Sequence, residues 1–212
     1  MTKGTITRER IIAAAAPIFN RHGFEGASIT EILDATGLEK GGLYRHFASK
    51  EELAVASFRH VLANTVKLRT EGLDEVANAG DKLRFTIQRF IESPSIVPGG
   101  CPLLNTVIDS DDGNPALYRL ARKAIRNWKS RLLRIVEDGI KRGEIQSSVE
   151  PRRIANTIVA ILEGAQMISR MEDSQQALED AQESLDILIR DIETQTAGSK
   201  RKVRTQRAVR SR

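Results

Sequence analysis

The segment SITEILDATGLEKGGLYRHFASKEEL, residues 28–53, decides the fold because it predicts two short helices joined by a tight turn. Ser28 followed three residues later by Glu31 is a capping box, which places the start of a helix directly after Ser28. Gly37 supplies the left-handed residue that ends this helix. A second short helix is expected over residues 39–46, with its polar side facing outward.

Two helices of this length around a glycine-bearing turn form a helix-turn-helix unit, whose second helix enters the major groove of DNA. Leu43 and Phe47 lie one turn apart and are expected to point inward. Glycine destabilises the interior of a helix, so the presence of Gly41 and Gly42 in this short helix suggests that another backbone approaches closely there. The phosphate backbone of DNA is the expected candidate. A second capping box at Ser49 begins a long helix whose free N–H groups suit a phosphate. The candidate DNA-contacting residues are Ser28, Thr30, Lys40, Gly41, Gly42, Tyr44, Arg45, His46 and Lys50.

A larger set of positions agrees in register with one known family, namely Gly23-Phe24, Ser28-Ile29-Thr30, Ile32, Ala35, Gly37-Leu38, Lys40-Gly41, Leu43-Tyr44, His46-Phe47, Ser49-Lys50-Glu51 and Leu53. In these positions the chain resembles the DNA-binding domain of the TetR family of transcriptional regulators, over roughly its first quarter. Glu39 departs from the family, which more often carries a serine or threonine cap there. This departure weakens the start of the second short helix without changing the fold assignment.

The composition bounds the function classes. A chain of 212 residues can bury a core, and aromatics make up only 4% of it, so this core must be aliphatic. The net charge is +5, but residues 200–212 carry seven Lys/Arg and no acid, so the remainder has a net charge of −2. DNA affinity must therefore come from a local patch. We expect residues 197–212 to be a disordered, solvated tail, with non-specific phosphate contact as the alternative.

Several other kinds of chemistry lack the residues that they need. Cys101 is the only cysteine, so an intrachain disulfide is impossible and a structural zinc site is not expected. The three histidines have no metal-ligand spacing, and neither Gly-Gly pair has a phosphate-loop context. We therefore expect no metal and no cofactor. No apolar run approaches membrane-spanning length, which predicts a soluble, cytoplasmic protein without a membrane partner.

The rest of the chain reads as amphipathic helices with no alternating β-type segment. Nine helices are expected, over residues 7–23, 29–36, 39–46, 50–72, 81–93, 102–108, 114–143, 151–168 and 175–192. Thr7 is expected to cap the first helix, and Pro151 to open the eighth. The predicted fold is all-α: a three-helix helix-turn-helix head over residues 1–50, a six-helix domain over residues 51–196, and the basic tail over residues 197–212.

The resemblance implies a ligand-binding and dimerisation domain after the head. In the family, the middle helices enclose a small-molecule pocket and the last two helices form a dimer interface. By position, the pocket residues would be Phe85, Phe90, Cys101, Leu104, Tyr118 and Trp128. The interface residues would be Ile158, Leu162, Leu185, Ile189 and Ile192.

These observations lead us to expect a homodimeric DNA-binding regulator, a repressor that leaves a palindromic double-stranded operator when it binds a small-molecule effector of unknown identity. Cys101 leaves alternatives open. It is a packed apolar residue in one interpretation and a thiol sensor of electrophiles in another, since a helix start favours the thiolate. A cysteine-dependent enzyme would need a basic partner in space. A pure oligomeric scaffold would leave the pattern of residues 28–53 without a purpose.

Overall fold

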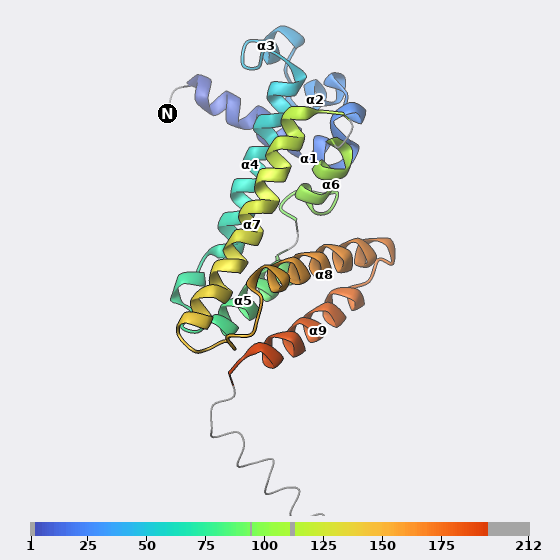
Figure 1. Ribbon diagram of the computed structural model, residues 1–212. Helices are drawn as coiled ribbons and strands as arrows, with labels where there is room; N and C mark the ends of the chain where they lie inside the picture. Colours follow the sequence, from blue (N-terminus) through green and yellow to red (C-terminus); the bar gives the residue numbers. More distant parts are fainter. Residues whose placement is uncertain (1–2, 94, 111–112, 195–212) are drawn as a thin grey trace, which may run out of the picture.

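The structure, a computed structural model, describes residues 3–93, 95–110 and 113–194 (Figure 1). Within these residues there are nine α-helices and one 3-10 turn over Leu73–Glu75, and no strand beyond an isolated bridge between Ile145 and Glu193. The helices are α1 (Lys3–Gly26), α2 (Ile29–Thr36), α3 (Lys40–Tyr44), α4 (Lys50–Thr70), α5 (Ala79–Glu92), α6 (Pro102–Ser110), α7 (Pro115–Lys141), α8 (Pro151–Met171) and α9 (Gln176–Ile192). The all-α prediction is confirmed. The predicted tail lies outside the described residues.

The serine caps predicted at the starts of α2 and α4 are both present, but the first one is not a complete capping box. The Ser28 hydroxyl accepts a hydrogen bond from the Glu31 N–H at 3.0 Å, and Gly37 ends α2 at φ 66°. The Glu31 carboxylate, however, lies 3.3 Å from Nε2 of His22 and so connects α2 to α1. At the start of α4 the Ser49 hydroxyl accepts from the Glu52 N–H at 3.1 Å, as a helix cap should.

The first helix begins earlier than the sequence pattern predicts. α1 starts at Lys3, so Thr7 lies inside it and the prediction that Thr7 caps the helix is wrong. Gly23 interrupts the regular helix at φ 70° and ψ 179°, but helical residues continue to Gly26. A Cβ atom at Gly23 would overlap the carboxylate of Asp109, so this position needs glycine for space as well as for its backbone angle.

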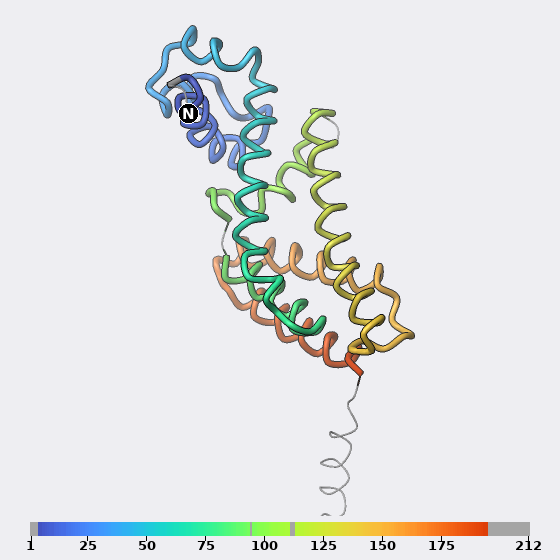
Figure 2. Tube along the Cα trace, turned by 90° about the vertical axis from the view of Figure 1, so that its left-hand side faces the viewer, coloured from blue at the N-terminus to red at the C-terminus, as the bar shows by residue number. Residues whose placement is uncertain are grey.

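Two long helices, α4 and α7, run alongside each other and connect the two ends of the molecule (Figures 1 and 2). The head, formed by α1, α2, α3 and the first turn of α4, lies at one end, and the antiparallel pair α8 and α9 lies toward the other. The head has its own core, whose largest fully buried side chains include Ile11, Ile32, Leu43 and Phe47. None of the described helices is both long and apolar enough to cross a membrane.

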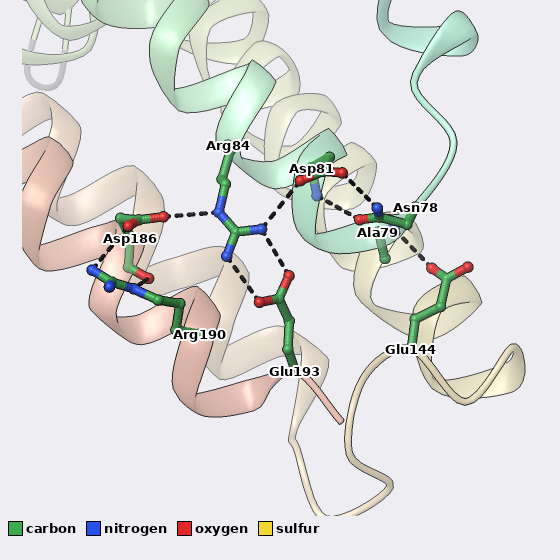
Figure 3. Close-up of polar contacts among 8 residues, drawn as sticks. All are labelled: Asn78, Ala79, Asp81, Arg84, Glu144, Asp186, Arg190 and Glu193. Atoms are coloured by element: carbon green, nitrogen blue, oxygen red, sulfur yellow. Dashed lines mark hydrogen bonds and ion pairs between the residues drawn. The ribbon is translucent and has the colours of Figure 1, made fainter. Parts of the chain in front are cut away.

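The far end is held by a polar cluster between α5 and α9 (Figure 3). Arg84 donates to Asp186 at 2.8 Å and makes two hydrogen bonds to the Glu193 carboxylate, at 2.7 and 2.8 Å. The backbone N–H of Ala79 donates to Glu144 at 2.7 Å, which closes the loop after α7 onto the start of α5. Hydrogen bonds to these carboxylates raise the pKa of Arg84 above its ordinary value, so its charge is permanent. The cluster therefore holds α9 against α5.

Candidate nucleic-acid interface and cavity

The second helix of the head presents a polar face. Leu43 and Phe47 are each 1% exposed and point into the core, as their spacing predicts. Lys40, Tyr44 and Arg45 are exposed, with Tyr44 at 39%. Three more predicted contact residues also keep an open surface, since Thr30 is exposed and Gly42 and His46 are partly exposed. An exposed tyrosine between two cations suits phosphate and base contacts.

The glycines of α3 are not required by the fold of this chain. A Cβ at Gly41 would meet nothing within 4 Å, and one at Gly42 would make only ordinary contact with Leu38 at 3.7 Å. Neither residue has a positive φ. Because the chain itself does not crowd them, the glycines leave space on the outside of the helix for an approaching molecule.

Two of the predicted contact residues already have partners within the chain. The Ser28 hydroxyl serves as the cap of α2. Lys50 donates to the carbonyl oxygen of Glu25 at 3.2 Å, and its ammonium lies 4.7 Å from the centre of the Phe24 ring. Lys50 therefore connects α4 to the end of α1. Glu39, at the start of α3, makes no side-chain cap hydrogen bond, in agreement with the weak cap that its sequence predicts.

The predicted dimer-interface residues face the core of their own chain. Ile158, Leu162, Leu185 and Ile189 are 0% exposed and Ile192 is 8% exposed. Their side chains have almost no surface left to contact a second subunit, so the prediction that these five residues form the interface is wrong. The apolar side chains that α8 and α9 leave exposed are instead Met167, Ile168, Met171 and Ile187, at 51%, 41%, 80% and 49%.

A cavity of about 170 Å³ lies between α4, α5, α7 and α8, with the start of α6 at its wall. Three of the predicted pocket residues, Phe90, Cys101 and Trp128, line it. The other three, Phe85, Leu104 and Tyr118, do not line this cavity. The Phe85 ring lies beside Gly72 and under the Arg89 guanidinium, and Leu104 packs into the core between α4, α6 and α7.

The sequence pattern missed the polar part of the cavity wall. Thr65, Arg69 and Glu163 each bring a buried polar atom to it, and Thr70, Thr86, Asn127 and Arg131 also line it. Arg69 lies over the Phe90 ring, 4.2 Å from its centre, and Phe90 stacks on Trp128 with ring centres 5.5 Å apart. Glu163 is 9% exposed. One signal was available, because Glu163 is the only charged residue in the stretch of α8 between Arg153 and Arg170. A buried lone charge in such a helix usually has a function or a partner.

Cys101 faces a carboxylate as well as a helix-start N–H group. It is 7% exposed, and its Sγ donates to Oε1 of Glu163 at 3.1 Å. Burial, followed by the charge of Glu163, raises the pKa of Cys101 to about 12, whereas the backbone N–H of Leu104 lowers it. The helix start therefore acts in the expected direction but is outweighed, and the structure favours the packed, protonated thiol.

We expect the thiol of native Cys101 to react slowly with a disulfide reagent from pH 7 to pH 9. The thiolate is the reactive form, and a pKa of about 12 leaves little of it in this range. The rate should rise only above pH 9, whereas the urea-unfolded chain should react fast at pH 9. Stopped-flow labelling measures both. A native rate that levels off near pH 8.5 would contradict the protonated thiol.

Hydrogen bonds connect the cavity wall to the head. Asn105, on α6, donates to the backbone carbonyls of Asn20 at 3.1 Å and Gly99 at 2.8 Å. Asn20 in turn donates to the carbonyl of Pro98 at 2.8 Å. One turn further along α6, Asp109 accepts from the Phe24 N–H at 2.7 Å. The segment that begins at the cavity is therefore attached directly to α1.

Comparison with known proteins gives matches over both halves of the chain. Residues 11–56 match the family model described as bacterial regulatory proteins, tetR family, and residues 79–185 match the tetracyclin repressor-like C-terminal domain. A TetR transcriptional regulator from Chloroflexus aurantiacus is 41% identical, with a TM-score of 0.86 over 91% of this chain and 98% of that one. A regulator from Cytophaga hutchinsonii is 34% identical, with a TM-score of 0.85 over 92% and 99%.

Among curated proteins, the A-factor receptor protein of Streptomyces griseus is 31% identical over 168 residues. The match covers 78% of this chain but 56% of the receptor. The chain therefore spans little more than half the length of that relative.

Proposed function

The chain belongs to the TetR family of transcriptional regulators, and on that premise we propose that it binds a palindromic operator as a homodimer and is released by a small-molecule effector. It is a DNA-binding regulator and not an enzyme. The observation that carries the DNA-binding step is the exposed face of α3, where Lys40, Tyr44 and Arg45 surround two uncrowded glycines. A helix-turn-helix places such a face in the major groove.

The exposed apolar side chains of α8 and α9 support the homodimer. Met167, Ile168 and Met171 on α8 and Ile187 on α9 are large, apolar and between 41% and 80% exposed. An isologous contact between two copies would cover these side chains with each other. A two-fold dimer would also place two recognition helices on one side, as a palindromic site requires.

We expect a Met171→Asp/Ile187→Asp variant to be monomeric and to lose most of its operator affinity. Both side chains are exposed on the surface of the single chain, so the introduced charges should disrupt the contact with a second subunit without destabilising the fold. Sedimentation velocity and circular dichroism measure the two properties. The control is Ile108→Asp, on α6, where an equally apolar side chain is 70% exposed. A double variant that remains dimeric would contradict this interface.

Two connections between the cavity and the head support release by an effector. α4 runs from the core of the head, where Leu53 is buried, to the cavity wall at Thr65 and Arg69. α6 starts at the cavity and holds α1 through Asn105 and Asp109. A ligand that moves either helix would change the position of the recognition helix, because a packed element transmits a shift at one end to the other.

The experiment that tests the proposed function is an enrichment of genomic DNA fragments on the purified protein, followed by anisotropy titrations of the enriched fragments. We expect affinities at least about 10³-fold tighter than for random DNA of the same length. Equal affinities for enriched and random fragments would contradict a sequence-specific regulator.

A further inference from the structure

Three buried polar atoms on the cavity wall have no hydrogen-bond partner within the described residues. They are Oγ1 of Thr65, Nε of Arg69 and Oε2 of Glu163. Leaving such an atom unpaired costs about 1–3 kcal/mol, so native proteins keep few of them. Their occurrence together on one wall indicates that this part of the molecule is built to bind a polar group that comes from outside the chain.

The three atoms come from two sides of the cavity and have fixed orientations. Thr65 and Arg69 are four residues apart on α4 and so lie on one face of that helix. The Arg69 guanidinium is held on the Phe90 ring at 4.2 Å, and the other Glu163 oxygen is occupied by the Cys101 thiol at 3.1 Å. A ligand therefore meets N–H and O–H donors on the α4 side and a carboxylate oxygen on the α8 side.

The remaining wall is mostly apolar and aromatic, and the space is small. Phe90 and Trp128 stack with their planes 11° apart beside Leu62, Val66 and Leu103, and the polar side chains of Thr70, Thr86, Asn127 and Arg131 also reach the wall. The volume of about 170 Å³ is close to the roughly 150 Å³ of an engineered apolar cavity that binds benzene. One substituted aromatic ring is the size of molecule that this space accepts.

We infer that the effector is an uncharged molecule built on one aromatic ring, with a hydroxyl that donates to Glu163 and a carbonyl oxygen that accepts from Arg69 and Thr65. This inference rests on the proposed function, since it names the ligand class of the same cavity. The charged groups with a buried, unpaired atom are Arg69 and Glu163, and their charges oppose each other across the site, whereas Arg131, the other cation of the wall, is partly exposed to solvent. A ligand carboxylate would be buried near Glu163, and a ligand ammonium near Arg69, and either arrangement carries a like-charge penalty.

The test uses four para-substituted rings of similar size on the DNA-free protein: 4-hydroxyacetophenone, 4-methoxyacetophenone, 4-ethylphenol and 4-ethyltoluene. Trp128 is the only tryptophan of the chain, so its fluorescence reports binding at the cavity wall. We expect 4-hydroxyacetophenone to bind most tightly. Loss of either the donor or the acceptor should weaken binding about tenfold, the value of one hydrogen bond to a charged group.

Two variants assign the hydrogen bonds to residues. Glu163→Met removes the carboxylate at similar length and should erase the preference for the hydroxyl over the methoxy compound. Thr65→Val keeps the shape of the side chain and should weaken both ketones about threefold without changing 4-ethylphenol. The control is Tyr118→Phe, which removes a hydroxyl that lies on α7 outside the cavity wall and should change nothing.

The wild-type series is decisive even where a variant does not fold. Equal affinities for all four compounds, or tighter binding of 4-hydroxybenzoate than of 4-hydroxyacetophenone, would overturn the inference. The same holds if no compound quenches Trp128 below about 1 mM while operator binding is intact. Binding that does not release the operator would support the ligand class and contradict the release step of the proposed function.

Discussion

A Lys40→Ala/Arg45→Ala variant is expected to bind the operator about 100-fold more weakly than the wild type. Both side chains are exposed on α3, and neither forms an ion pair with a described residue; Arg45 makes only a long contact of 3.4 Å to the Gly41 carbonyl. Each cation would contact a phosphate or a base edge, so the loss should fall on binding and not on stability. The slope of log affinity against log salt should decrease by up to about 2. Anisotropy titrations at several salt concentrations measure both effects.

The matched control removes the same charge elsewhere. Arg152 and Arg153 are exposed at the start of α8, far from the head, and Arg152→Ala/Arg153→Ala lowers the net charge equally. We expect this control to keep the affinity within about twofold, since distant exposed charges are screened. Equal losses in the two double variants would show that the binding depends on net charge and would contradict the α3 face as the recognition surface.

Replacing Phe47 by alanine is expected to unfold the head while the rest of the protein stays folded. Phe47 is 1% exposed and carries the Arg8 guanidinium 4.5 Å from its ring centre. Truncating a buried phenylalanine costs about 3–5 kcal/mol, and the lost cation–π contact adds about 0.5–1 kcal/mol. Phe47 is the one aromatic side chain among the buried residues of this core, and a loss of this size is comparable to the stability of a small domain. Operator binding should disappear.

Hydrogen exchange with mass spectrometry separates this local effect from global unfolding. Amides of residues 5–47 should lose protection, while the emission of Trp128 and the protection of α8 stay unchanged. Tyr44→Ala is the control, because it removes an aromatic ring from the same stretch at a site that is 39% exposed. Unchanged protection of the head in the Phe47→Ala protein would contradict an independent core in this region.

The local signals in the sequence predicted the helices well, because caps and breakers act over a few residues. Ser28 and Ser49 cap α2 and α4, Gly37 ends α2 in the left-handed conformation, and Pro151 opens α8. These preferences follow from backbone groups that any helix end must satisfy. The prediction that Thr7 caps the first helix was wrong because a residue whose side chain can cap a helix is also tolerated inside one.

Periodicity could not say which face of a terminal helix meets a partner. Leu185 and Ile192 follow the strongest apolar stripe of α9, and that stripe packs into the core of the same chain. The exposed apolar residues are interspersed with polar ones, as Met171 is between Arg170 and Glu172. Whether a stripe faces the own core or another subunit depends on tertiary packing, which a helical period alone does not encode.

The structure brings only part of the predicted pocket set together at one cavity. Phe90 and Trp128 line it, whereas Phe85 and Tyr118, on the same two helices, do not. The polar residues Thr65 and Arg69 look like ordinary surface residues of α4 in the sequence. Their burial arises because α5, α7 and α8 cover that turn of α4, which is a property of the assembled fold.

The central claim is that two copies of the α3 face read one palindromic site. Hydroxyl-radical footprinting of an enriched genomic fragment tests it most directly, with the wild-type protein and the Lys40→Ala/Arg45→Ala variant side by side. We predict two protected patches related by a two-fold axis and separated by about one helical turn, roughly 34–36 Å, or a multiple of it. Both patches should vanish together in the variant. A single unpaired patch, or protection that the variant retains, would contradict the account.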